Sequence, residues 1–323
     1  MDPYFTIVVP TGPQPDQLAG CLQALNAQTL SSDQFEIVVV DDYNRPETAA
    51  VVASFSQASR VEIRYLAQPG RQGLAAARNR GWRAARSQFI AFTDADCLPQ
   101  PSWLAAAQGM FRRGAQVVTG SVQAVAYRLP GQPRSQLIPD ITELSTANCF
   151  CQKMTLQRAG GFEETFDLAW REDLDLQFKF LEMGIPILRC PEAVVVQPMR
   201  PTLWYTSLNN ERKNRYDALL YKRHPQLFRQ RIHRSEVLVA RQYLTVAGLA
   251  TALLSAAAGY WSMLLPGLAV WLFFTGLSLS EEWSGQADLL TNAKQAGATS
   301  VASPFLSVYW RLYGAVKYRV LYF

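Results

Sequence analysis

The chain has 323 residues, of which 49% are hydrophobic and 18% are charged, and its 31 Lys and Arg against 26 Asp and Glu give a net charge of +5. This composition is too apolar for a disordered chain, and the length predicts one large domain with an addition. The odd number of cysteines, five, and a strand-like segment that starts directly after Tyr4 argue against a secreted disulfide scaffold.

Strand-like and helix-like segments alternate through the first part of the chain. Short apolar runs predict four strands, and the segments between them have helical spacing. The second strand is expected to be buried on both faces, because its Ile-Val-Val-Val run has no polar position. This alternation predicts a parallel, doubly wound sheet of the α/β class. In chain order we expect strand 5–9, helix 17–28, strand 35–40, helix 47–57, strand 61–66, helix 73–85 and strand 89–93.

Carboxylates follow two of these strands. Asp41 and Asp42 end the second strand, and Asp94-Ala95-Asp96 follows the fourth. Ligands bind at the C-terminal ends of the strands in such sheets. Two carboxylates this close together are costly unless a cation is bound, and Mg²⁺ or Mn²⁺ prefers oxygen ligands, water and phosphate. We therefore expect a divalent cation at Asp94 and Asp96, although Asp-x-Asp alone also occurs in solvated turns.

Four segments, in this order and spacing, resemble the family 2 glycosyltransferases of the GT-A fold. The segments are Phe5-Thr-Ile-Val-Val-Pro10, Ile37-Val-Val-Val-Asp-Asp42, Gly73-Leu-Ala-Ala-Ala-Arg-Asn-Arg-Gly81 and Phe89-Ile-Ala-Phe-Thr-Asp-Ala-Asp-Cys-Leu-Pro99. Downstream, Asn148 with Gly160-Gly-Phe-Glu-Glu164 is similar to the acceptor-side segment of that family, and Arg171-Glu-Asp-Leu-Asp-Leu176 to its Glu-Asp motif. The resemblance spans about residues 4–225 and implies a GT-A doubly wound, mostly parallel sheet.

The resemblance also implies a nucleotide-sugar site at the strand ends. The donor would be a UDP, GDP or dTDP sugar. Asp96 would coordinate the Mn²⁺ or Mg²⁺ that bridges the diphosphate, and Asp94 would lie on the ribose or metal side. The plainer alternatives are that Asp41 caps a helix or a turn and that Arg78 forms a surface ion pair. The residues that the resemblance places on the nucleotide and metal are Pro10, Thr11, Asp41, Asp42, Arg78, Asn79, Asp94, Ala95 and Asp96.

The reaction explains why these residue types are needed. A metal neutralises the departing nucleoside diphosphate without a proton transfer. The acceptor hydroxyl must lose its proton as it attacks the anomeric carbon, and a carboxylate can take it. The resemblance gives this role of general base to Asp173, with Glu172 as its nearest rival. A single displacement of this kind inverts the anomeric configuration.

The sequence departs from the family in two places. The loop after Pro10 lacks the usual Tyr-Asn pair, and the Gln-x-x-Arg-Trp motif of processive synthases is absent. In its place, Arg212, Lys213 and Arg215 either close over the diphosphate or bind anionic lipid. Residues 120–148 are rich in Pro and Gly, and we expect a mobile loop there. A Rossmann motif is missing and the basic stretch adjoins an apolar one, so neither a dinucleotide nor a nucleic acid is expected as a ligand.

Charge is distributed unevenly. Residues 200–241 hold ten Lys or Arg and three acids, a net charge of +7, and residues 243–280 form a run of 38 without a charged side chain. This run is nearly twice as long as a single helix needs to cross a bilayer, so it predicts a two-helix transmembrane hairpin with a turn at about 258–262. A re-entrant or interfacial hairpin is the main competitor. A buried soluble hairpin would usually have a polar face.

Cations flank the apolar run on both sides, whereas its turn has none. The positive-inside rule therefore predicts a multi-pass protein of the inner (plasma) membrane with a cytoplasmic catalytic domain. Residues 305–323 mix aromatics with cations, which is typical of a helix on a membrane surface. The expected division is a catalytic domain at 1–230, a basic linker at 231–242, the hairpin at 243–280 and a cytoplasmic or interfacial tail at 281–323.

These observations predict an inverting, metal-dependent glycosyltransferase with a membrane-held, lipid-linked glycan acceptor, acting in polysaccharide or cell-envelope synthesis. A polyprenyl-phosphate glycosyltransferase is the alternative, since a lipid phosphate needs less of a base. An inactive membrane scaffold of the same fold is the third hypothesis, and the intact set of acids argues against it.

Overall fold

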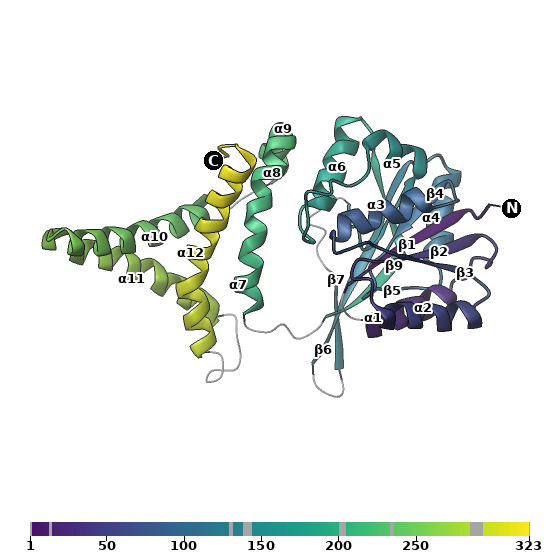
Figure 1. Cartoon of the computed structure of the whole chain (residues 1–323), viewed down its shortest axis with the longest axis horizontal. Coiled ribbons are helices and arrows are strands. Elements are labelled where there is room, and N and C mark those ends of the chain that lie inside the picture. Colours follow the sequence, from purple (N-terminus) through teal and green to yellow (C-terminus); the bar gives the residue numbers. More distant parts are fainter. Residues whose placement is uncertain are drawn as a thin grey trace. The chain divides into compact units, whose positions relative to one another are not determined.

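The computed structural model describes residues 2–12, 15–128, 132–137, 144–199, 205–232, 236–284 and 293–322. The chain divides into two compact units, Met1–Arg200 and Pro201–Phe323. Figure 1 shows the sheet and its helices in the first unit and only helices in the second. Residues 205–230, which the sequence analysis assigns to the catalytic domain, pack with the C-terminal helices of the second unit.

Within the described residues, nine strands form one sheet in the order β3-β2-β1-β4-β8-β6-β9-β5, with β7 paired to β6. The first four strands are parallel to one another, and each lies within two residues of its predicted bounds. As predicted, the second strand is buried along its whole length. These strands are β1 (Phe5–Thr11), β2 (Phe35–Asp41), β3 (Glu62–Ala67) and β4 (Phe89–Phe92).

The second half of the sheet is mixed, so the sheet is less parallel than predicted. Strand β8 runs antiparallel to β4 and β6, whereas β9 runs parallel to β6 and antiparallel to β5. Strands β6 and β7 occupy much of the segment for which we expected a loop, and residues 129–131 and 138–143 of that segment lie outside the described residues. The remaining strands are β5 (Leu98–Pro99), β6 (Val117–Arg128), β7 (Gln132–Leu137), β8 (Cys149–Gln152) and β9 (Ile187–Met199).

Helices cover both faces of the sheet. Alternate residues of β1 point to opposite faces, as in any strand. Ile7 packs in one core cluster with α1, α2 and α4, whereas Val8 packs in the other with α3, α5 and α6. A side chain on Gly81 would collide with Val8, so α3 lies close against β1. The helices are α1 (Pro15–Asn26), α2 (Pro46–Ala58), α3 (Leu74–Ala84), α4 (Trp103–Arg112), α5 (Lys153–Ala159) and α6 (Glu172–Glu182).

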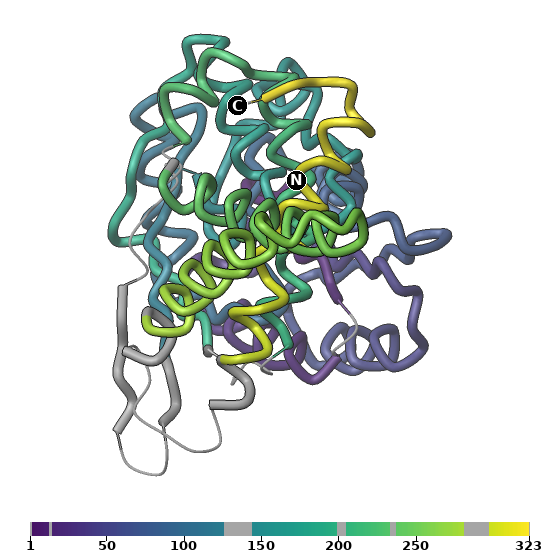
Figure 2. The backbone as a smooth tube through the Cα atoms, turned by 90° about the vertical axis from the view of Figure 1, so that its left-hand side faces the viewer, coloured from purple at the N-terminus to yellow at the C-terminus, as the bar shows by residue number. Residues whose placement is uncertain are grey.

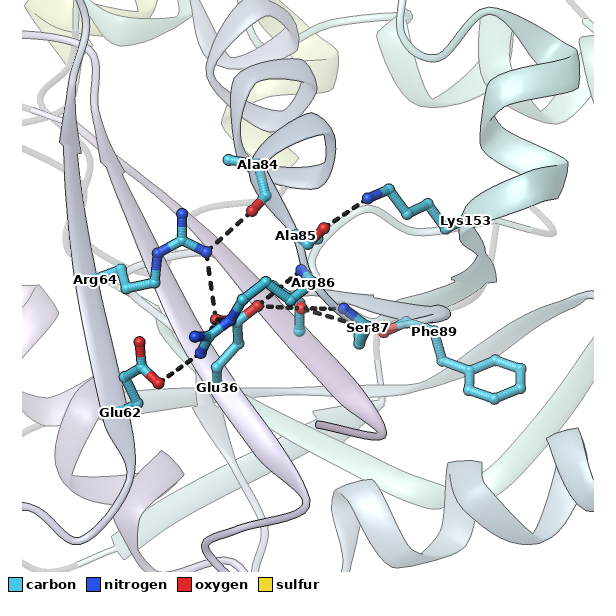
Figure 3. Close-up of polar contacts among 10 residues, drawn as sticks. Glu36, Glu62, Arg64, Ala84, Ala85, Arg86, Ser87, Phe89 and Lys153 are labelled. Atoms are coloured by element: carbon cyan, nitrogen blue, oxygen red, sulfur yellow. Dashed lines mark hydrogen bonds and ion pairs between the residues drawn. The ribbon is translucent and has the colours of Figure 1, made fainter. Parts of the chain in front are cut away.

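A hydrogen-bonded polar cluster lies at the amino ends of the parallel strands (Figure 3). Glu36, at the start of β2, is only 1% exposed. Its Oε1 accepts hydrogen bonds from the Thr6 hydroxyl at 2.7 Å and the Arg86 N–H at 3.0 Å. Its Oε2 accepts from Arg86 Nε at 2.9 Å and Arg64 Nη1 at 3.3 Å. Burial raises the pKa of Glu36, but these hydrogen bonds outweigh burial and hold the pKa below its usual value.

The second unit contains the predicted hairpin. By length and composition, residues 237–257 and 261–280 are each able to cross a membrane. The turn between them contains Gly259 with φ +78°, inside the predicted turn. A Cβ on Gly267 would come within 2.8 Å of the Gly248 carbonyl oxygen, so the two backbones pack closely, as small residues allow in membrane helices. The helices are α10 (Glu236–Ala257) and α11 (Trp261–Ser284).

Helix α12 (Ala293–Tyr318) packs with one side on α8, η1, α10 and α11. A side chain on Gly314 would collide with the backbone of Arg215, so α12 and α8 are in close contact. Figure 2 shows α12 in yellow behind the green hairpin. The shorter helices are α7 (Thr206–Asn210), η1 (Glu211–Asn214), α8 (Arg215–Arg223) and α9 (Pro225–Arg231).

Candidate functional site

The two carboxylates that end β2 organise the loops around them. Asp41 accepts the backbone N–H groups of Tyr43 at 2.9 Å and Arg45 at 2.8 Å, and the Tyr65 hydroxyl at 2.9 Å. Asp42 accepts the N–H groups of Gln72 and Gly73, at 2.8 and 3.0 Å. Both carboxylates are buried. Asp41 therefore forms the turn that was the plainer alternative, and Asp42 joins β2 to the loop before α3.

Two cationic side chains extend from the loops held in this way. Two guanidinium groups lie near the ring of Tyr43, with Cζ of Arg45 5.7 Å and Cζ of Arg71 5.3 Å from its centroid. At the end of β1, Thr11 pairs with Asp41 in the sheet register. The Thr11 hydroxyl is buried and has no hydrogen-bond partner among the described residues. This edge of the sheet thus combines positive charge with an unused hydroxyl, and both suit a nucleotide.

Arg78 lies at the centre of the site. It is 1% exposed, and its guanidinium bridges two acids from distant parts of the chain. Nη2 donates to Asp94 Oδ1 at 2.8 Å, and Nη1 donates to Glu172 Oε1 at 3.1 Å. Arg78 is therefore a buried ion-pair centre, not the surface ion pair considered as an alternative. It joins the Asp-x-Asp segment to the Glu-Asp motif.

The Glu-Asp motif begins α6. Arg171, the residue before it, has φ +74°, a conformation that costs a residue with a side chain about 1–2 kcal/mol. Its guanidinium stacks on Trp170, with Cζ 4.9 Å from the ring centroid. Asp173 Oδ1 accepts the N–H of Leu174 at 2.7 Å. Carboxylates in the first helical turn are favoured by the helix dipole.

Burial raises the pKa of both acids of this motif. It raises the pKa of Glu172 to about 7, against the lowering effect of Arg78. It also raises the pKa of Asp173, while the Leu174 N–H, Arg78 and Arg171 act in the opposite direction. Raised carboxylate pKa values suit proton transfer near neutral pH.

A cavity of about 360 Å³ brings these groups together. Arg78, Asp94, Glu172 and Asp173 line it, so the structure gathers these four predicted residues around one space. It also adds lining residues that the sequence analysis missed. Trp170 is next to the Glu-Asp motif, and its position was the one available signal. The other added residues are Ser145, Thr146, Ala147, Ala169 and Gln197, whereas Arg171 and Leu174, which also line the cavity, belong to the predicted motif.

The donor set fits a cation that arrives with a diphosphate. One oxygen of Asp94 is on Arg78, and Asp96, half-buried, accepts only the Gln197 amide at 3.2 Å and the Cys97 thiol at 3.4 Å. These Asp96 contacts are those among the described residues, where no group of three or more His, Cys, Asp or Glu side chains could hold a metal. A hard divalent cation commonly uses one or two carboxylates and takes its other ligands from phosphate and water. Asp96, with Asp94 beside it, provides that minimal set.

Two asparagines of the predicted motifs make hydrogen bonds that hold the fold. Asn79 donates to the Phe162 carbonyl and to Glu164, and its oxygen accepts from Trp82 and from the Phe162 N–H. An asparagine amide has no capacity beyond four such bonds, so the geometry favours a positioning role over the predicted nucleotide contact. Asn148 likewise joins β6 and β9 through the Ser121 and Ala193 carbonyls.

Pro10 and Ala95 are buried at the strand ends, as their predicted places require. Arg212 and Arg215 belong to the second unit. Arg215 donates to the Tyr216 hydroxyl at 2.7 Å and lies over the Tyr216 and Trp310 rings, whereas Arg212 is exposed. Their closure over a diphosphate stays a prediction.

Comparison with known proteins gives one family and a set of distant relatives. Residues 6–170 match the family described as glycosyl transferase family 2. Glycosyltransferase AglE of Haloferax volcanii is 30% identical over 37% of this chain, and a pre-mycofactocin glycosyltransferase of Mycobacterium tuberculosis is 28% identical over 52%. These matches span only 36% and 38% of the two relatives.

A solved structure has a similar fold. It is the mannosyltransferase PcManGT from Pyrobaculum calidifontis, in complex with GDP-Man and Mn²⁺. The superposition covers 99% of this chain and 88% of that one, with a TM-score of 0.55 and 18% identity. At this identity the likeness establishes the fold, which is the GT-A-like α/β fold expected from the sequence.

Proposed function

This chain belongs to glycosyl transferase family 2, and we propose that its first unit transfers a sugar from a nucleotide-sugar donor to an acceptor hydroxyl with inversion at the anomeric carbon. The observation that carries the proposal is the bridge through Arg78, which places the Asp-x-Asp segment and the Glu-Asp motif on one cavity. A glycosyl transfer needs these two groups on opposite sides of the breaking bond.

The donor side is the edge formed by β1, β2 and β4. The nucleoside would lie against Thr11 and the Tyr43 loop, where a buried hydroxyl and exposed cations are available. The diphosphate would lie toward Asp96. The mannosyltransferase of the same fold was solved with GDP-Man and Mn²⁺, which supports a nucleotide sugar and a divalent cation as the ligands. When bound, the cation would neutralise the departing diphosphate.

The acceptor side is the start of α6. Of its two acids, Glu172 is held by Arg78, so its charge is already compensated. Asp173 lines the same cavity and makes no ion pair with Arg78. Burial raises its pKa, which makes it a stronger base than an exposed carboxylate. We therefore assign proton removal from the acceptor to Asp173 and the positioning of Arg78 to Glu172.

The acceptor is proposed to be a lipid-linked glycan at the inner face of the plasma membrane. Two adjacent apolar helices in the second unit support membrane attachment, and the cations on both flanks support a cytoplasmic catalytic unit. Arg212 and Arg215 are proposed to contribute to the diphosphate or to lipid. The reaction would then belong to polysaccharide or cell-envelope synthesis.

Release of nucleoside diphosphate by the full chain in native membranes tests the proposal. Asp96→Ala and Asp173→Asn should each reduce turnover at least 100-fold, as expected for loss of a charge-stabilising group or a general base. Asp33→Asn, at an exposed carboxylate outside the site, is the matched control and should retain turnover.

Turnover that survives both substitutions would refute the assignment. Turnover that survives Asp173→Asn but not Asp96→Ala would instead favour an acceptor that is already ionised, such as a polyprenyl phosphate.

A further inference from the structure

Helix α12 has an exposed apolar stripe that packing within its unit leaves uncovered. Tyr309, Leu312, Tyr313 and Val316 are 56%, 47%, 39% and 78% exposed. Their spacing of three, one and three residues places them on one face of the helix. Large apolar side chains grouped in this way on a surface usually mark an interaction site.

The opposite face of the helix fixes its orientation. Val308 and Ala315 are buried within the second unit. The hydroxyl of Ser307, also buried, donates to Gln242 of α10 at 3.0 Å and accepts from Asn214 of η1 at 3.1 Å. Because these contacts fix the buried face of α12 within the unit, the helix cannot rotate about its axis to bury the stripe. The stripe therefore needs a partner outside the unit.

The hairpin indicates what that partner is. In Figure 1, α12 runs across the base of α10 and α11 instead of continuing alongside them, and α12 contacts both helices. The hairpin exposes large apolar side chains along its length, among them Leu254, Leu265 and Phe273. A hairpin that spans a bilayer would hold α12 along the membrane surface. Residues in that layer are typically aromatic or amphipathic, as Tyr309 and Tyr313 are.

Charge agrees with a lipid partner. Residues 293–323 contain four Lys or Arg and no acid. Lys317 follows Val316 directly, and its Nζ lies 6.0 Å from the ring centroid of Tyr313. Arg319 is also exposed. Cations beside an apolar stripe match an anionic headgroup layer better than a neutral protein surface.

We propose that α12 is an interfacial helix whose stripe of Tyr309, Leu312, Tyr313 and Val316 inserts into the headgroup layer of an anionic bilayer. This inference rests on the membrane attachment in the proposed function, and adds a second, surface-parallel contact to the hairpin. It also differs from an expectation based on composition alone. Tyr318 and Tyr322, two of the aromatics in the tail, are buried within the unit and do not face lipid.

The test uses fluorophores on single introduced cysteines in the full chain, reconstituted in vesicles of phosphatidylcholine and phosphatidylglycerol. The five native cysteines are buried, so an introduced surface cysteine can be labelled selectively. Labels at Leu312→Cys and Val316→Cys report on the stripe. Leu265→Cys, exposed on the hairpin, reports on membrane insertion, and Met154→Cys, exposed on the first unit, is the control outside the membrane.

Lipids brominated near the headgroup should quench the labels at 312 and 316, and leave the label at 154 unquenched. Deeply brominated lipids should quench the label at 265. Quenching at 265 with none at 312 and 316 would overturn this inference and leave the membrane attachment intact. Absence of quenching at 265 would overturn both.

Two further results separate lipid from other partners. Lys317→Glu should reduce quenching at 312 in vesicles with phosphatidylglycerol and have little effect in pure phosphatidylcholine. A label at 312 that is shielded without any lipid quenching, more strongly at higher protein concentration, would show that a second copy of the chain covers the stripe and would overturn the lipid assignment.

Discussion

Two buried glutamates at opposite edges of the same sheet have opposite environments. Glu36, at the amino ends of the strands, is 1% exposed and accepts hydrogen bonds on both oxygens. Glu172, at the carboxyl edge, is 4% exposed, and its Oε2 has no hydrogen-bond partner among the described residues. Hydrogen bonds hold the pKa of Glu36 below its usual value despite burial, whereas burial raises the pKa of Glu172 to about 7.

This difference distinguishes two clusters, a structural cluster around Glu36 and a functional cluster around Arg78 and Glu172. Buried polar groups in proteins are almost always hydrogen-bonded, and Glu36 follows that rule. At the other edge, Arg78 serves two acids, its Nε has no partner among the described residues, and Arg171 has a strained backbone. Shifted pKa values and unpaired polar groups of this kind tend to gather where ligands bind. The carboxyl edge therefore has the features of a site for a charged ligand, whereas the amino edge stabilises the fold.

Removing the cation of the functional cluster should have the largest effect on stability. Arg78→Met leaves Glu172 buried without its counter-ion, and breaking such a pair costs about 3–5 kcal/mol in the free energy of unfolding. Urea unfolding of the detergent-solubilised full chain at neutral pH measures this loss. Part of it should be recovered at pH 5, where Glu172 is protonated. An equal loss at both pH values would show that the missing charge is not the cause.

Removing the carboxylate of the structural cluster should have the next largest effect. Glu36→Gln replaces acceptors of charged hydrogen bonds, and about 2–3 kcal/mol of unfolding free energy should be lost. Glu172→Gln should change it by less than about 1 kcal/mol, because the amide keeps an oxygen for Arg78 and removes a charge that burial disfavours. The same urea titration compares the two variants. The reverse order of effects would contradict the distinction between the clusters.

The two glutamates should also give opposite pH dependence. The lowered pKa of Glu36 contributes stability above its unfolded value of about 4.3, and this stability is lost as pH falls through the folded pKa. The raised pKa of Glu172 contributes stability below about 4.3, and this stability is lost as pH rises toward about 7. Melting temperature against pH measures both effects.

In that experiment, Glu36→Gln should flatten the acid limb of the curve, and Glu172→Gln should flatten the decline between about pH 4 and 7. Identical curves for the two variants would contradict the opposite shifts.

An exposed ion pair should matter least. Arg83 and Glu164 are 3.2 Å apart on the surface of the first unit, with about half of each side chain exposed. Arg83→Ala should change the unfolding free energy by no more than about 0.5 kcal/mol. A loss as large as that of Arg78→Met would mean that burial does not determine how much an ion pair contributes to the unfolding free energy.

The sequence predicts the strands and acids at the carboxyl edge of the sheet better than the long-range ion pairs that join them. Apolar runs were sufficient to locate β1, β2 and β4, and the acids after β4 were sufficient to predict Asp94, which lines the cavity. These signals are local. The ion pair between Arg78 and Glu172 joins residues 94 positions apart, and it depends on how β8 and β9 return to the sheet.

Residues that serve both structure and function were also hard to assign. Asn79 and Asp42 have the types that bind nucleotides, but hydrogen bonds to Phe162 and Gly73 occupy them. No periodicity shows which partner such a side chain takes. Likewise, Gly120 and the nearby prolines led us to expect a loop in place of β6, with its alternating Val and Ala. Gly120 is nevertheless suited to this strand, because a side chain there would collide with Ala193 and Asn148.

The most direct test of the account is the melting temperature of the full chain with nucleotide sugars and Mn²⁺. One of the UDP, GDP or dTDP sugars should raise it, because a ligand at 100 times its dissociation constant adds about 2.7 kcal/mol of stability. The rise should need Mn²⁺, persist in Glu36→Gln and disappear in Asp96→Ala. If no nucleotide sugar raises the melting temperature with Mn²⁺, or if Asp96→Ala responds like the unmodified chain, the carboxyl edge of the sheet is not a nucleotide-sugar site.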